Sequence, residues 1–160
     1  MYRRTLWLLA LLVFSPVIRG AGDAVLDRGT LRGLKALSVV IDTVDPQLGQ
    51  AGLTTDLLQR QLEARLRSGG VTVDQGAVEF LGLRISSARA GKGPYSLCLS
   101  IGLYQPVTLN RDRNIRTATQ TWEVETLLVA QPKLLMQSSG AALDRLADRF
   151  VTAWRSVNPQ

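Results

Sequence analysis

The chain has 160 residues and a formal net charge of +6; it contains one cysteine and no histidine, and 46% of its residues are hydrophobic. This length suits one domain with a single core, and the charge is too modest to indicate a nucleic-acid-binding protein. The lack of histidine excludes the serine and cysteine triads that use it and most zinc sites.

Residues 1–24 are predicted to be a secretory signal peptide. They contain a basic start, an apolar run at 6–14 and small residues around 20–24. The alternative is an uncleaved membrane anchor, but Pro16 breaks the apolar run well short of the roughly 20 residues that span a bilayer. We therefore expect one domain over residues 25–160, periplasmic or secreted, with no transmembrane span.

The mature chain is expected to be weakly basic. Loss of Arg3, Arg4, Arg19 and Asp23 with the leader would leave 16 basic and 12 acidic residues, a net charge of +4. This excess favours weak attraction to anionic envelope components and predicts no binding to nucleic acid. Cys98 has no partner for an internal disulfide, and its place in an apolar strand indicates a packed side chain rather than a nucleophile.

The first half of the domain predicts a strand followed by a helix. Residues 34–44 alternate as a strand with Leu37, Val39 and Ile41 on one face. The helix is expected to start at an N-cap on Thr54 and to end at the glycine pair 69–70. Its apolar seam consists of Leu58, Leu62 and Leu66.

The second half predicts three further strands. Residues 79–88, 95–109 and 117–129 have strand character, with polar turns between them. In the longest of these runs, leucine-type residues occupy one face and small residues the other, which is typical of a sheet covered by helices on one side only. The small residues are Ser96, Cys98, Ser100 and Gly102. Pro106 indicates an edge position or a bulge near the end of that strand.

The last predicted helix covers residues 139–157, with Ser138 or Ser139 as its cap. Its wide apolar stripe, which needs a sheet to cover, consists of Leu143, Leu146, Ala147, Phe150, Val151, Trp154 and Val157. The predicted fold is therefore α+β, a two-layer sandwich with a mainly antiparallel sheet of four to five strands and two helices on one face. The order of elements is β-α-β-β-β-α.

Two groups of charged residues are candidate sites. Arg111, Arg113 and Arg116 crowd the predicted turn 110–116, which is either an ordinary solvated hairpin tip or a docking site for a lipid headgroup, a phosphorylated glycan or an acidic partner. The carboxylates of Glu123 and Glu125 share one face of the last strand.

Paired carboxylates on a sheet are more typical of solvated charge than of a hydrolase dyad. We predict no catalytic, cofactor-binding or metal-binding residue, and no cofactor.

The segments LSVVIDTVD at 37–45 and GLTTDLLQRQLEARLRSGGVTV at 52–73 resemble the opening strand, helix and second strand of periplasmic α/β modules. Among these modules are the LptE-like assembly lipoproteins and the amino-terminal domain of TolB. The LptE-like members carry a lipid on a cysteine after the leader, and this chain has no cysteine there. The resemblance implies a non-catalytic role in envelope assembly or partner binding, and it identifies no functional residue.

The leading expectation is an exported, periplasmic, non-catalytic binding or envelope-assembly module. Its partner would be an envelope protein or an anionic envelope component, and its oligomeric state stays open. One alternative is a hydrolase of unfamiliar type that uses Glu123, Glu125 or Asp112. Another is a secreted enzyme inhibitor that presents a hairpin loop to its target.

Overall fold

The structure is a computed structural model that describes residues 22–159. The predicted leader therefore lies almost entirely outside the described residues. The elements, in chain order, are α1 (Val25–Gly29), β1 (Ser38–Ile41), α2 (Pro46–Gln50), α3 (Thr55–Ser68), β2 (Phe80–Arg89), β3 (Tyr95–Leu109), β4 (Asp112–Ala130), the 3₁₀ turn η1 (Pro132–Leu134) and α4 (Leu135–Val157).

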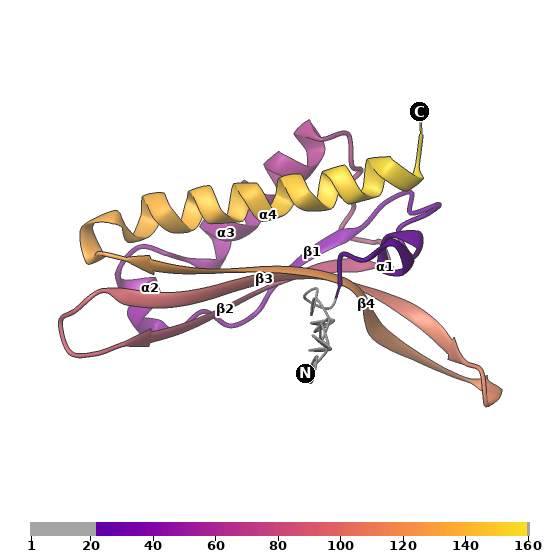
Figure 1. Ribbon diagram of the computed structural model, residues 1–160, viewed down its shortest axis with the longest axis horizontal. Helices are drawn as coiled ribbons and strands as arrows, with labels where there is room; N and C mark the ends of the chain where they lie inside the picture. The colour runs from indigo at the N-terminus through magenta and orange to yellow at the C-terminus, as the bar shows by residue number, and fades with distance from the viewer. Residues whose placement is uncertain (1–21, 160) are drawn as a thin grey trace, which may run out of the picture.

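The four strands form one sheet in the order β1-β2-β3-β4. β1 runs parallel to β2, and the other neighbours are antiparallel. The two long helices, α3 and α4, lie on the same side of the sheet (Figure 1). This arrangement confirms the predicted α+β sandwich with two helices on one face, to which the short helices α1 and α2 are added.

The start of α3 follows the predicted capping chemistry. The Thr54 hydroxyl oxygen accepts a hydrogen bond from the backbone N–H of Leu57 at 3.3 Å, and Asp56 lies in the first turn, where the helix dipole favours negative charge. After the helix, Gly70 has a φ of 84°, a conformation that favours glycine. The seam of Leu58, Leu62 and Leu66 is fully buried, as predicted.

The beginning of α4 differs from the prediction. The helix starts at Leu135, and so neither Ser138 nor Ser139 is its cap. Pro132 opens a 3₁₀ turn that leads directly into the helix, and the fully buried Leu135 extends the apolar stripe by one turn. Ser139 is buried inside the helix instead, and its hydroxyl has no hydrogen-bond partner among the described residues.

The stripe of α4 makes the centre of the core. Phe150 meets Trp122 of β4 edge to face, with 5.2 Å between ring centroids, and both side chains are buried. Trp154, at the end of the stripe, is only half-buried, and its indole N–H donates to the backbone carbonyl of Leu34 at 3.1 Å. α4 thus covers the sheet along most of its length.

The first strand is shorter than the predicted 34–44. Only Ser38–Ile41 pair with β2, while Leu37 makes an isolated bridge to Val73. Asp45 then accepts a hydrogen bond from the backbone N–H of Gln47 at 2.8 Å and so caps α2, a short helix between the first strand and α3.

The hairpin between β3 and β4 projects beyond the rest of the sheet. Pairing between β2 and β3 stops at Phe80 and Tyr104, whereas β3 and β4 stay paired as far as Leu109 and Asp112. We call this two-stranded extension, residues 105–119, the arm; Figure 1 shows it leaving the body of the sheet. Pro106 lies within it, where β3 has lost its β2 neighbour, as the sequence indicated.

Candidate binding face

The sheet has a second face, opposite α3 and α4, which we call the open face. Strand alternation places small residues of β3 on this face, among them Ser96, Cys98, Ser100 and Gly102, as predicted. Neighbouring positions on β2 and β4 remain exposed; they are Arg84, Ser86, Ala88, Glu125, Leu127 and Val129. A sheet face that keeps three apolar side chains in water is available to a partner.

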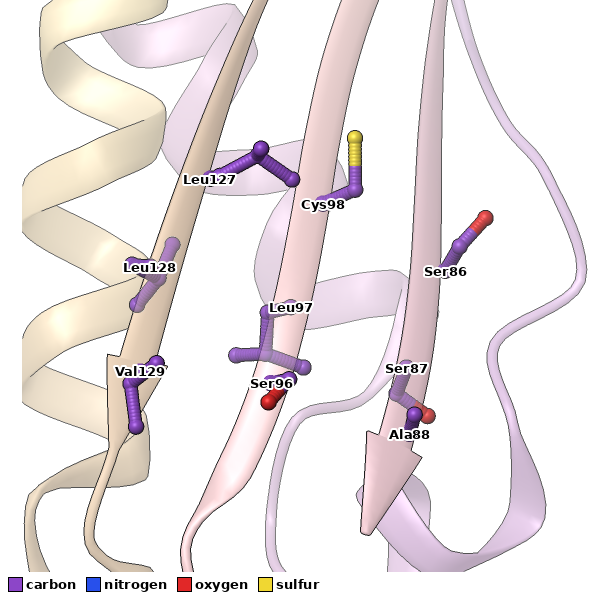
Figure 2. A pocket seen from close by; sticks show the side chains of 9 residues that line it. All are labelled: Ser86, Ser87, Ala88, Ser96, Leu97, Cys98, Leu127, Leu128 and Val129. Carbon is purple, nitrogen blue, oxygen red and sulfur yellow. The ribbon is translucent and has the colours of Figure 1, made fainter.

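One end of the open face forms an apolar groove. Leu127 and Val129 of β4 are 78% and 70% exposed, respectively, and stand beside Ser96 and Cys98 of β3 (Figure 2). The hollow has a volume of about 550 Å³ and continues onto Ser86 and Ala88 of β2. We call the surface of these six residues the groove. The small side chains of β3 form its floor, and the two large apolar side chains of β4 form one wall.

Carboxylates lie next to the groove on β4. Glu125 Oε2 is 4.0 Å from the Cys98 sulfur, and Glu123 lies two residues further along the same face. Within residues 22–159, neither carboxylate takes part in an ion pair. Arg84, a positive side chain on the same face, pairs with Asp42 at 3.0 Å and also feels the negative charge of Glu123. Glu123 and Glu125 thus give this part of the open face an excess of negative charge, and we call these two residues the acidic row.

This setting makes Cys98 a poor nucleophile. Partial burial raises the pKa of the Cys98 thiol, and the negative charges of Glu125 and Glu123 raise that pKa further. A thiol held in its neutral form at neutral pH fits the predicted packed role. Its half-buried position on the floor of the groove still leaves it accessible to small reagents.

The far end of the open face is closed by side chains of the sheet itself. Phe80 and Tyr104 stack with ring centroids 4.8 Å apart and planes inclined by 6°. The Tyr104 ring lies over Gly82, and the Gln120 side chain lies over Gly102, so each glycine leaves room for a larger neighbour. The Tyr104 hydroxyl donates to Gln120 Oε1 at 3.0 Å. The groove is thus the more accessible end of the face.

The three predicted arginines all lie on the arm, but the turn is tighter than predicted. β4 resumes at Asp112, so Arg113 and Arg116 belong to the strand and Arg111 to the turn. Every residue from 111 to 119 is exposed, including Ile115 at 43%. None of the three arginines has an ion-pair partner among the residues that the structure describes.

The structure separates the carboxylates that were considered for a hydrolase. Glu123 and Glu125 share the open face as predicted, whereas Asp112 lies at the tip of the arm. Across residues 22–159, no group of three or more His, Cys, Asp and Glu side chains is placed to hold a metal ion. In the same part of the chain, no helix combines the length and apolar character needed to cross a membrane.

Sequence reasoning missed the groove, although the signal was present. Trp122 and Val124 define the buried face of β4, and continuing that alternation puts Leu127 and Val129 on the opposite face. Two large apolar residues on a face otherwise made of small and charged residues mark an exposed apolar patch.

No protein-family model matches the chain, and no curated relative matches it. Solved structures with some similarity include a PelC dodecamer from Paraburkholderia phytofirmans. Its sequence is 15% identical, the match covers 74% of this chain and 86% of the PelC chain, and the TM-score is 0.43. They also include a minor lipoprotein from Acinetobacter baumannii. Its sequence is 17% identical, the match covers 74% of this chain and 91% of the lipoprotein chain, and the TM-score is 0.35. The resemblance to LptE-like proteins and TolB stays a prediction.

Proposed function

We propose that this chain is an exported, periplasmic, non-catalytic binding module whose open face docks an extended protein segment with apolar and basic side chains. The observation that carries the proposal is the exposure of Leu127 and Val129 at 78% and 70%. Burying one such side chain is worth about 1.5–3 kcal/mol, so a partner that covers both gains binding energy. Glu125 beside the groove favours basic side chains in that partner.

The export part of the proposal is supported by the leader pattern, and the contacts of Asp23 bear on where that leader is cut. The Asp23 carboxylate accepts two hydrogen bonds from Arg28, at 2.8 and 3.0 Å, and one from the Trp122 indole at 3.3 Å. These contacts favour a cut that keeps Asp23 in the mature protein. The small-x-small pattern at Gly20 and Gly22 suits cleavage just before Asp23. Intact-mass measurement of the exported protein tests this: a start at Val25 would contradict it.

The single cysteine of the chain gives a direct test of groove occupancy. Alkylation of Cys98 by iodoacetamide, at alkaline pH because the thiol pKa is raised, is timed in the presence of synthetic peptides. Peptides that alternate apolar with basic residues should slow the reaction, and matched peptides with acidic residues should not. No protection by any peptide up to millimolar concentration would overturn the proposal.

Two variants make this test specific. Leu127→Lys removes half of the apolar wall of the groove and adds positive charge, so the basic peptides should no longer protect Cys98. Val78→Lys is the matched control, because Val78 is 71% exposed but lies outside the groove and should leave protection unchanged.

The arginines of the arm support a second candidate function, docking on an anionic lipid headgroup, phosphorylated glycan or acidic partner. The observation in its favour is that Arg111, Arg113 and Arg116 are exposed without a carboxylate partner among the described residues. The triple change of these residues to serine should abolish binding to anionic vesicles, and binding should fall as salt rises. The same change at Arg32, Arg60 and Arg145 keeps the net charge equal and serves as the control.

A further inference from the structure

We infer that the arm of one copy of this chain docks in the groove and against the acidic row of a second copy, so that chains associate head to tail. The inference rests on the proposed function, because the groove is the same binding surface. It identifies the docked segment as one that the chain itself carries.

The two surfaces are complementary in chemistry. The tip of the arm presents Ile115 in sequence between Arg113 and Arg116, an apolar side chain flanked by positive charges. The groove offers an apolar wall next to Glu125 and Glu123, which have no ion-pair partner within residues 22–159. Arginine binds carboxylates with two parallel hydrogen bonds, which also fixes the orientation of the docked segment.

The surfaces cannot meet within one molecule. The arm forms one end of the β3–β4 ribbon (Figure 1), and the strand register places Ser96 and Val129 of the groove near its other end. At about 3.3 Å per residue, Asp112 at the tip lies about 50 Å along β4 from Leu127 in the groove. Complementary surfaces on opposite ends of one subunit produce a heterologous contact, which repeats into a closed ring or an open filament.

Association of two copies through their open faces is less favourable than docking of the arm in the groove. It would bring the acidic row of one copy towards that of its partner, and repulsion between like charges weakens such an interface. It would also leave the arm uncovered on both of its faces. A two-stranded hairpin outside a core is marginally stable in water, so docking would stabilise the arm as well as fill the groove.

The test uses two variants of the exported protein, each lacking one surface. The arm variant is Arg111→Ser/Arg113→Ser/Arg116→Ser, and the groove variant is Leu127→Lys. Molar mass is measured by light scattering and sedimentation from micromolar to millimolar concentration. The parent should grow beyond a dimer as concentration rises, and each variant alone should associate about tenfold more weakly or not at all.

An equimolar mixture of the two variants is the decisive sample. The arm variant still has an intact groove and the groove variant still has an intact arm, so the mixture should form heterodimers and nothing larger. High salt should dissociate them, because the contact depends on charge. The controls Val78→Lys and Arg32→Ser/Arg60→Ser/Arg145→Ser should assemble like the parent.

Two results would overturn the inference: a parent that stays monomeric at millimolar concentration, or an arm variant that assembles as well as the parent. Neither result contradicts the proposed binding function of the groove. That function would be contradicted if basic peptides did not protect Cys98. A monomeric parent with peptide-protected Cys98 would mean that the groove binds a different chain.

Discussion

The two faces of strand β4 both carry apolar side chains, but these side chains differ greatly in how much of their surface is exposed. Trp122 and Val124 are 1% and 3% exposed under α4, whereas Leu127 and Val129, on the other face, are 78% and 70% exposed. All four side chains are apolar, and so the difference comes from which face the helices cover. The covered face holds the domain together, and the open face leaves apolar surface for binding.

The largest expected effect is on the covered face. Phe150→Ala removes a fully buried ring that packs edge to face on Trp122, so it should lower the free energy of unfolding by about 3–5 kcal/mol. Urea denaturation of parent and variant measures the change. A loss below about 1 kcal/mol would mean that α4 does not rest on the sheet in this way.

A smaller effect is expected where α3 ends against α4. A Cβ added at Gly69 would lie 2.5 Å from Cγ2 of the buried, β-branched Val151, so Gly69→Ala should destabilise the domain by about 1–3 kcal/mol.

Gly29→Ala is the control for this prediction, because no atom lies within 4 Å of a Cβ at that position. It should not destabilise the domain and should stabilise it by up to about 1 kcal/mol, because alanine restricts the unfolded chain more than glycine does. Equal changes in the free energy of unfolding from Gly69→Ala and Gly29→Ala would show that Val151 leaves room for a larger side chain at position 69.

Acid should weaken the attachment of the N-terminal segment to the covered side. Hydrogen bonds from Arg28 hold the pKa of the Asp23 carboxyl below its ordinary value, with smaller contributions from Trp122 and Arg149. A lowered folded-state pKa means that this stability is present above the unfolded value of about 3.9 and is lost as pH falls through the folded value.

Asp23→Asn should therefore cost about 2 kcal/mol at pH 7 and a smaller amount at pH 3, where the carboxyl of the unfolded chain is already largely protonated. Asp148→Asn is the comparison, because its ion pair with Arg65 is roughly half exposed on both sides and contributes little once solvent screens it. Thermal melts across this pH range measure both variants. A loss for Asp23→Asn that is the same at both pH values would remove the ionic explanation.

The smallest effect on stability is expected on the open face. Leu127→Thr keeps strand propensity and removes a side chain that is already in water, so the free energy of unfolding should change by less than about 0.5 kcal/mol. The same variant should lose protection of Cys98 by basic peptides. A large loss of stability would mean that Leu127 supports the fold and is not reserved for a partner.

Much of the fold followed from the sequence because periodicity and capping act locally. The leucine seam of α3, its Thr54 cap and the small residues of β3 all appear where their spacing predicts. The start of α4 and the tight turn at residues 110–111 did not, because pairing across the sheet and a buried Leu135 extended these elements beyond their local signals. The exposed pair Leu127 and Val129 could have been found from the alternation of β4 alone, but the floor of the groove depends on the register of β2, β3 and β4, which no single segment encodes.

The most direct test of the account is the alkylation rate of Cys98 as a function of protein concentration. The thiol lies on the floor of the groove, so an arm docked there should shield it from the reagent without any added peptide. The account predicts that the rate falls with increasing concentration in the parent and stays constant in the arm variant Arg111→Ser/Arg113→Ser/Arg116→Ser. A rate that is independent of concentration in the parent, or that falls equally in both proteins, would contradict it.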